Sequence, residues 1–184
     1  MCLKMIKPVF VADANFVAEQ VKRLMPAVEP FVIPNGIDAE KFTPADENKA
    51  DLLAAAGLPT HLRYVGCAAR LEPVKAHHVL IQAMQTLPED IGLLLAGDGS
   101  VRTKLQALVK KLGLSQRVFF LGHVQDMKSF YRLLDVFCLS SNNEGLPLAP
   151  LEAQACNVPV VLTDVGGCKE ARRRSKHHER TFVD

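Results

Sequence analysis

Residues 91–113 read IGLLLAGDGSVRTKLQALVKKLG and contain the repeating unit of the fold. Residues 91–97 are apolar without alternation, which is typical of a strand buried on both faces of a sheet. From Ser100 onward the apolar residues recur with helical spacing, and we predict that Ser100 caps this helix and Gly113 ends it. A buried strand followed by an amphipathic helix predicts one unit of a parallel sheet covered by helices.

The same alternation extends on both sides of this stretch. Four more apolar runs are predicted to be strands: residues 62–69, 117–122, 136–141 and 158–164. The spacing predicts helices over residues 76–87, 126–135 and 148–156. The fold class is therefore α/β, with a Rossmann-like, doubly wound parallel sheet. Ligands of such sheets bind beyond the carboxyl ends of the strands, so the loops that follow strands are the candidate sites.

Local patterns predict further details. The helix over residues 76–87 is expected to bury one face, formed by Val79, Leu80, Ala83, Met84 and Leu87. Asp126 is expected to cap the following helix. Residues 8–26 are predicted to form a strand and a helix, and residues 29–44 a strand and a turn.

Charge and composition argue against a nucleic-acid partner. The chain has 22 Lys and Arg against 20 Asp and Glu, but residues 172–184 hold five of the basic and two of the acidic ones. The remainder is nearly neutral, and the chain has no Trp and two Tyr for stacking on bases. Five cysteines without a C-x-x-C pair, among them Cys67 and Cys138 in apolar runs, predict buried reduced thiols. With no signal peptide or membrane-spanning run in the sequence, we expect a cytoplasmic protein.

The loop after the first predicted strand of the sheet carries Arg70 and Lys75. A guanidinium and an ammonium at a strand's carboxyl end suit a diphosphate, because each charge-assisted hydrogen bond contributes about 1.5–3 kcal/mol. The alternative is two solvated surface cations. The next loop, GDGS at residues 97–100, starts like a dinucleotide fingerprint, but Arg102 stands where that motif needs a small residue. A turn that precedes a helix explains residues 97–100 better than a dinucleotide site does.

Residues 142–152, NNEGLPLAPLE, hold the most informative loop. Gly145 lets the backbone approach a ligand, and the amides of Leu146, Leu148 and Ala149 are predicted to face an anion at the start of the helix. Pro147 has no N–H and cannot take part.

Two carboxylates flank this anion site. Glu144 lies in the loop and Glu152 about one turn into the helix. A carboxylate accepts hydrogen bonds from vicinal hydroxyls, so the pair suits a diphosphate placed between two polyols, as in a nucleotide sugar. The alternative is a surface residue at Glu144 and a first-turn residue at Glu152 that complements the helix dipole.

The ordered set of motifs resembles the C-terminal, donor-binding domain of retaining glycosyltransferases of family 4, one half of a GT-B fold. The resemblance covers roughly residues 32–171 and rests on VIPNGIDAEKF, AARLEPVK, LLLAGDGSVRTKL, VFFLGHV, EGLPLAPLE and ACNVPVVLTDVGG. It implies that Glu144 contacts the donor sugar, Glu152 the ribose, and Arg70 and Lys75 the diphosphate. It also implies that the loop with Val124 and Asp126 lies against the base.

The resemblance has further implications. It divides the chain into an N-terminal-domain remnant over residues 1–30, the donor domain over residues 31–171, and a disordered or atypical tail over residues 172–184. The donor would be a UDP-, GDP- or ADP-sugar, bound without a cofactor or metal. The acceptor, a glycan or a lipid-linked saccharide, would bind a missing N-terminal domain, and the full-length enzyme would associate peripherally with the inner face of the membrane. Its product would be a lipopolysaccharide, capsule or other glycoconjugate.

This chain departs from the family pattern at several points. AAR and EPVKA replace the usual glycine-containing forms of the first loop, and Asn157 stands at a helix end where Gly is common, a left-handed position that Asn tolerates. The alternatives are an inactive nucleotide-sugar-binding fragment and a GT-B-fold sugar-nucleotide epimerase. The chain alone is expected to hydrolyse a donor slowly at most, since the second wall of the cleft is absent.

Overall fold

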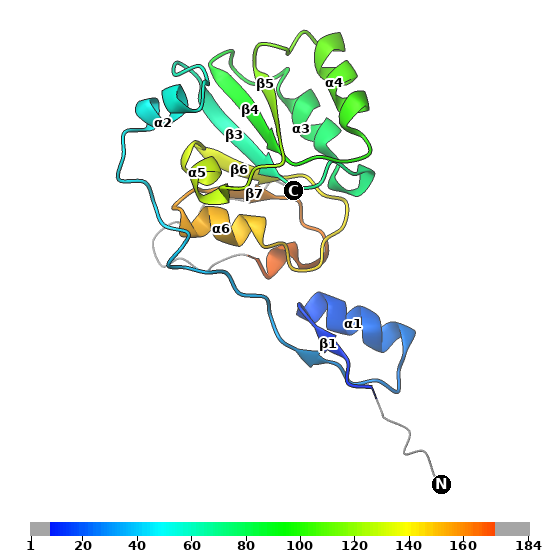
Figure 1. Cartoon of the computed structure of the whole chain (residues 1–184). Coiled ribbons are helices and arrows are strands. Elements are labelled where there is room, and N and C mark those ends of the chain that lie inside the picture. Colours follow the sequence, from blue (N-terminus) through cyan, green and yellow to red (C-terminus); the bar gives the residue numbers. More distant parts are fainter. Residues whose placement is uncertain (1–7, 172–184) are drawn as a thin grey trace.

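The computed structural model describes residues 8–171, and its centre is a five-stranded sheet (Figure 1). The strands are β3 Arg63–Ala68, β4 Ile91–Ala96, β5 Val118–Gly122, β6 Val136–Leu139 and β7 Val160–Leu162. They lie in the order β5-β4-β3-β6-β7, and every neighbouring pair is parallel. The predicted fold class and all five predicted strands are confirmed.

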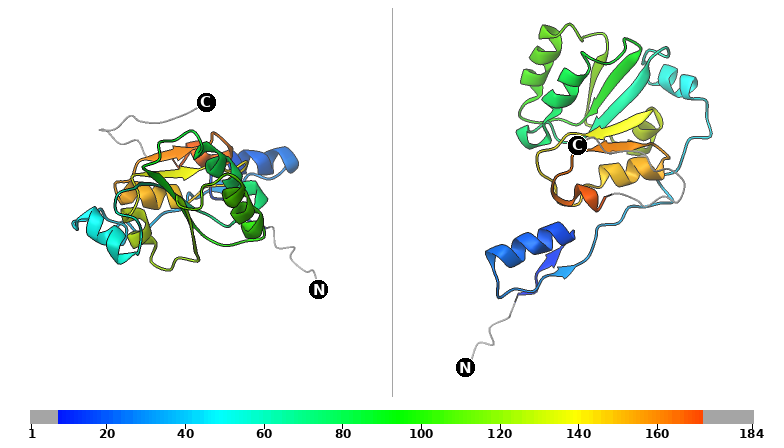
Figure 2. Two further views of the ribbon diagram at one scale, coloured as in Figure 1. Left: turned by 90° about the horizontal axis from the view of Figure 1, so that it is seen from above. Right: turned by 180° about the vertical axis from the view of Figure 1, so that it is seen from behind.

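Helices cover both faces of this sheet (Figures 1 and 2). The sheet helices are α3 His77–Ala83, α4 Arg102–Lys111, α5 Met127–Arg132 and α6 Ala149–Ala155. Helices α3 and α4 pack together on one face, and α5 packs on α6 on the other, as right-handed crossovers require when the chain reverses its direction across the sheet. That reversal lies between β3 and β6, so the crevice beyond their carboxyl ends is the expected ligand site.

The buried face of α3 differs from the prediction. The prediction is confirmed at Met84, which is fully buried, and Leu80 is partly buried against the core. It was wrong at Val79 and Leu87, which are 46% and 38% exposed, whereas His77 and Ile81 are fully buried. The helix spans His77–Ala83 and ends before Leu87, and its packing on the sheet decides which side is covered.

Three of the four predicted helix boundaries are confirmed. Asp126 caps α5 by accepting a hydrogen bond from the Ser129 amide, and Gly113 and Asn157 adopt positive φ at the ends of α4 and α6. The cap at Ser100 was wrong. Val101 occupies the N-cap position of α4, and Ser100 instead donates from its hydroxyl (2.6 Å) and its amide (3.0 Å) to the Glu72 carboxylate. The ionised Glu72 carboxylate, from a neighbouring loop, accepts both of these hydrogen bonds and so fixes the orientation of the serine.

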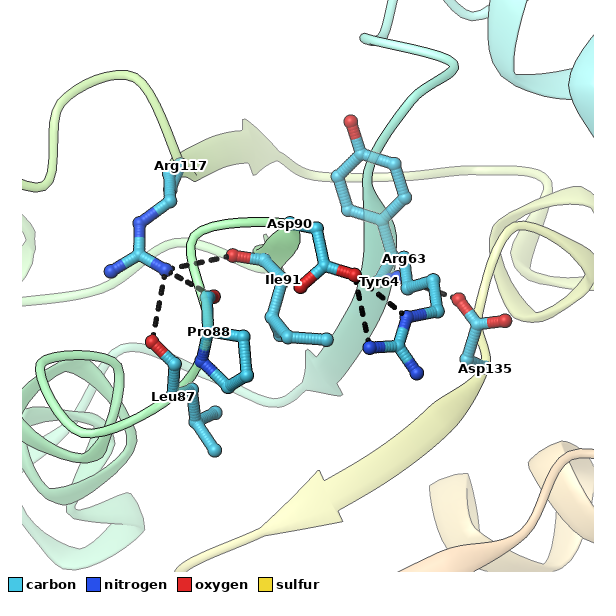
Figure 3. Close-up of polar contacts among 8 residues, drawn as sticks. All are labelled: Arg63, Tyr64, Leu87, Pro88, Asp90, Ile91, Arg117 and Asp135. Carbon is cyan, nitrogen blue, oxygen red and sulfur yellow. Dashed lines mark hydrogen bonds and ion pairs between the residues drawn. The ribbon is translucent and has the colours of Figure 1, made fainter.

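Polar side chains tie together the amino edge of the sheet (Figure 3). The Arg117 guanidinium donates to the carbonyls of Leu87, Pro88 and Ile91, and Asp90 pairs with Arg63 at 3.0 Å. Asp135 accepts from the Tyr64 amide at 2.6 Å. These contacts hold together the segments from which the strands begin.

A small N-terminal unit lies beside the main sheet (Figure 1). It contains β1 Val11–Ala12, α1 Asn15–Leu24 and β2 Phe31–Val32, with β1 parallel to β2. The Glu170 carboxylate joins the two parts, since it accepts from the amides of Asn15 (2.8 Å) and Phe16 (2.9 Å) at the start of α1. The predicted strand and helix are confirmed. The predicted tail, residues 172–184, lies outside the described residues.

The remaining elements connect these parts. They are α2 Lys49–Ala55, which precedes β3, and the short helices η1 Pro73–Lys75 and η2 Gly166–Lys169. Among residues 8–171, none of the helices has the length and apolar character needed to cross a lipid bilayer.

Candidate functional site

The loops that follow β3 and β6 are joined at the point where the strand order reverses. The Asn142 amide donates to the Val74 carbonyl at 2.8 Å, and the Ser140 hydroxyl donates to the Ala76 carbonyl at 3.1 Å. Arg70 and Lys75 belong to the first loop and Glu144 to the second, so the structure brings these predicted site residues to one edge.

Lys75 and Glu144 form an ion pair at the centre of this edge. Lys75 Nζ lies 2.6 Å from Glu144 Oε1, and the side chains are only 18% and 8% exposed. The Ser141 hydroxyl donates to the same oxygen at 2.5 Å. The sequence predicted separate ligands for the two charged groups and missed both the pair and Ser141. A serine at the end of a strand, three residues before a glutamate, was the available signal.

The backbone beside Lys75 is strained. Ala76 adopts φ 46 and ψ 36, the left-handed region that costs a residue with a Cβ about 1–2 kcal/mol. Its carbonyl accepts from Ser140, and its side chain is buried, so the surrounding packing holds this conformation. Strained residues of this kind gather at functional sites.

Glu152 lies in the first turn of α6 and is half-buried. The hydroxyl of Tyr131, from α5, donates to Glu152 Oε2 at 2.6 Å. Burial, and then this hydrogen bond, raise the pKa of Tyr131, so the hydroxyl keeps its proton. Sequence reasoning missed Tyr131, because nothing in the local pattern of α5 shows that it faces α6.

Two glycines determine the course of the loop that carries Glu144. A Cβ on Gly166 would stand 2.0 Å from the carbonyl oxygen of Glu144, and one on Gly167 2.1 Å from that of Gly145. The Gly167 amide also donates to the Glu144 carbonyl at 3.1 Å. The loop can therefore occupy this position only because residues 166 and 167 lack side chains.

The predicted anion site is formed by backbone at the start of α6. Leu148 occupies the N-cap position, and α6 begins at Ala149. Within residues 8–171, the amides of Leu146, Leu148 and Ala149 donate no hydrogen bond. They have no acceptor within the described residues, and their binding of an anion stays a prediction.

The family of the chain follows from its similarity to known proteins. Residues 48–179 match the family described as Glycosyl transferases group 1. The chain belongs to this family. A D-inositol 3-phosphate glycosyltransferase of Corynebacterium urealyticum is 37% identical over 158 residues, which are 79% of this chain and 37% of that protein. The lipopolysaccharide core biosynthesis mannosyltransferase LpsB of Rhizobium meliloti is 35% identical over 147 residues, 76% of this chain and 42% of the relative.

Solved glycosyltransferase structures share the fold. The crystal structure of Anabaena Alr3699/HepE in complex with UDP and glucose matches 88% of this chain and 46% of that protein, with a TM-score of 0.79 and 27% identity. The chain thus spans less than half the length of these relatives, and the group 1 family accounts for the sheet and the loops described above.

The other predicted site residues of this group 1 glycosyltransferase chain lie around the same edge. Arg70 is exposed and forms no ion pair within the described residues. Val124 is half-buried in the loop between β5 and α5. The Asp126 carboxylate is occupied by Ser129, whose hydrogen bonds lower the pKa of that carboxyl. A contact between Val124 or Asp126 and a base stays a prediction.

The titratable groups near the edge include thiols. Cys67 and Cys138 are free, and burial raises the pKa of both, in Cys138 to about 11. The prediction of buried reduced thiols is confirmed for Cys67, Cys156 and Cys168, while Cys138 is half-buried. In the described part of the chain, no group of three His, Cys, Asp or Glu side chains is placed to hold a metal ion.

His77 is buried beside this edge without a polar partner. Its side chain is 1% exposed, and neither ring nitrogen has a hydrogen-bond partner among residues 8–171. Burial, and then the charges of Lys75 and His78, lower the pKa of His77 to about 4 from 6.5. The native state therefore excludes the proton that the unfolded chain accepts below pH 6.5.

This exclusion predicts a pH dependence of stability. The contribution of neutral His77 is fully present above pH 6.5 and is lost as the pH falls toward 4. Between pH 7.5 and pH 5, the unfolding free energy of the wild type should fall by about 2 kcal/mol more than that of His77→Leu. Urea unfolding at both pH values measures this difference. His61→Leu, at an exposed histidine that does not act on His77, is the control and should follow the wild type; the same pH dependence in His77→Leu would contradict the assignment.

Proposed function

We propose that this chain is the donor-binding part of a retaining glycosyltransferase and binds a nucleoside-diphosphate sugar at the carboxyl edge of its sheet. One observation carries the proposal: the reversal between β3 and β6 gathers two cations, two carboxylates and three unpaired amides at one edge. The Anabaena structure with UDP and glucose, at 27% identity, supports a uridine diphosphate donor, while GDP- and ADP-sugars remain within the same chemistry.

Each of these residues is proposed to contact a different part of the donor. Arg70 and Lys75 bind the diphosphate together with the amides at the start of α6, and no metal takes part. The cations also stabilise the negative charge that develops on the leaving diphosphate, which is electrostatic catalysis. Glu152 accepts hydrogen bonds from the ribose hydroxyls, and Glu144 from the sugar. The loop with Val124 and Asp126 lies along the base.

The ion pair of Lys75 adds a step to this scheme. In this structure the ammonium contacts Glu144 at 2.6 Å. A diphosphate carries more negative charge than one carboxylate and competes for the ammonium. Ser141 remains a donor to Glu144, which keeps the carboxylate in place to accept the sugar hydroxyls. We propose that donor binding exchanges the Lys75 contact from Glu144 to the diphosphate.

The acceptor, a glycan or lipid-linked saccharide, is proposed to bind an N-terminal domain whose last part is the unit containing β1 and β2. The side chains of Val9, Val11, Phe31 and Ile33 are more than half exposed on this two-stranded parallel pair. Parallel sheets are normally covered on both faces, and two strands alone are marginally stable. Since β2 pairs with β1, we propose the domain boundary after Ile33 rather than after residue 30. The whole enzyme would act in the cytoplasm, at the inner face of the membrane.

Calorimetry with UDP, GDP and ADP and their sugars, in the presence and absence of EDTA, tests the proposal. One nucleotide family should bind, equally well with EDTA. Arg70→Ala should lower the affinity for the nucleoside diphosphate about tenfold or more, and the affinity for the nucleoside far less. Glu144→Ala should lower the affinity for the sugar nucleotide more than the affinity for the nucleoside diphosphate without its sugar.

Arg63→Ala is the matched control, because Arg63 is an exposed arginine like Arg70 but lies at the start of β3 and pairs with Asp90 at the opposite edge. It should bind like the wild type. Absence of binding by every nucleotide, or equal losses for nucleoside and diphosphate in Arg70→Ala, would overturn the proposal. Epimerised sugar nucleotide among the products would instead identify an epimerase.

A further inference from the structure

Both tyrosines of the chain are fully buried, but their hydroxyls lie at opposite edges of the sheet. The Tyr64 hydroxyl donates to the Pro59 carbonyl at 2.9 Å, near the amino edge. The Tyr131 hydroxyl donates to Glu152 Oε2 at 2.6 Å, at the carboxyl edge. A buried tyrosine needs a partner for its hydroxyl, yet only Tyr131 uses a group of the proposed site for this purpose.

Three aromatic rings hold Tyr131 in one orientation. The ring centroids of Phe42, Phe130 and Phe137 lie 5.9, 5.5 and 5.9 Å from that of Tyr131, all in edge-to-face geometry. Phe42 comes from the segment that leads from the N-terminal unit into the main domain, and Phe137 from β6. The hydroxyl therefore points at Glu152 from a rigid support, and its raised pKa keeps it a donor.

Tyr131 is the one hydrogen-bond partner of the Glu152 carboxylate among residues 8–171. It engages Oε2 and leaves Oε1 without a partner. A carboxylate whose rotation is fixed in this way loses less conformational freedom when it accepts a hydrogen bond from a ligand. A short hydrogen bond from a neutral donor thus fixes one oxygen and leaves the other to accept from a ligand.

We propose that Tyr131 is a positioning residue that sets how Glu152 recognises the ribose hydroxyls of the donor. The inference rests on the proposed function, because it assigns the ligand of Glu152 to a ribose. Tyr131 itself touches no ligand. Its removal should therefore weaken the recognition of the ribose hydroxyls and leave the contacts with the diphosphate unchanged.

The test compares a ribonucleoside diphosphate with its 2′,3′-dideoxy analogue, with UDP or GDP as the probe, whichever binds the wild-type chain more tightly. Tyr131→Phe should lower the affinity for the ribonucleotide about tenfold, since a hydrogen bond to a charged group is lost. It should lower the affinity for the dideoxy analogue by less than about twofold. The ratio of the two affinities, measured by calorimetry, should collapse toward one. General destabilisation of the fold would lower the affinity for both ligands and leave this ratio unchanged.

Two further variants separate positioning from stability. Tyr64→Phe removes an equally buried hydroxyl and should lower stability to a similar extent without changing the affinity ratio. In a Glu152→Ala background, Tyr131→Phe should leave the ratio as it is, because the group that it positions is gone. A ratio that falls further in that double variant would overturn the inference.

The outcomes distinguish this inference from the proposed function. If the wild type binds neither ligand, or binds both equally, the assigned role of Glu152 fails, and the positioning role of Tyr131 fails with it. If the wild type prefers the ribonucleotide and Tyr131→Phe keeps that preference in full, the inference is overturned while the proposed function stands.

Discussion

Lys75→Met is expected to lower the unfolding free energy by about 3 kcal/mol and to weaken nucleoside diphosphate binding roughly 10- to 100-fold. The stability loss arises because Glu144 is 8% exposed and would lose its cation, with Ser141 as its remaining partner. The affinity loss is expected because the variant lacks one of the two cations that we propose to contact the diphosphate. Urea unfolding and calorimetry with UDP and GDP measure the two effects.

The double variant Lys75→Met/Glu144→Gln separates these effects. Replacing both members of a buried ion pair leaves no uncompensated charge, so most of the stability should return. The diphosphate affinity should stay low, because the ammonium is still missing. Arg70→Met should weaken the diphosphate without a stability loss, since Arg70 is exposed and unpaired among the described residues. Wild-type stability in Lys75→Met would show that the pair does not support the loop.

Gly167→Ala is expected to lower stability by about 2–3 kcal/mol and to abolish measurable nucleotide binding. The new methyl group would stand 2.1 Å from the Gly145 carbonyl oxygen and 3.3 Å from the Ala14 Cβ. Neither side can yield easily, because the first contact is backbone and Ala14 is fully buried. The loop must therefore move, and Glu144 moves with it.

Gly36→Ala is the matched control for this prediction. A Cβ at Gly36 has no heavy atom within 4 Å, and its φ is not in the left-handed region. It should leave stability and nucleotide binding within experimental error of the wild type. Wild-type nucleotide affinity in Gly167→Ala would show that the position of the Glu144 loop is not set by these glycines.

The parts of the fold that depend on near neighbours in the chain were predictable. The five strands follow from continuous apolar runs, and the cap at Asp126 and the left-handed ends at Gly113 and Asn157 follow from residues within a turn of the position. The predictions at Ser100 and at part of the buried face of α3 were wrong because residues distant in the sequence decide both. Glu72, from the loop after β3, accepts from the Ser100 hydroxyl, and the packing of α3 buries His77 and Ile81 rather than Val79 and Leu87.

The sequence by itself placed Arg70, Lys75, Glu144 and Glu152 in the segments that follow strands of one parallel sheet, beyond the carboxyl ends of those strands. Only the tertiary structure decided which of them touch, and which groups support them. Lys75 and Glu144 are 69 residues apart, and Tyr131 and Glu152 are 21 apart. A local pattern assigns a residue to an edge or to a helix face, but contacts between loops depend on strand order and on how helices pack, which the whole chain must fold to establish.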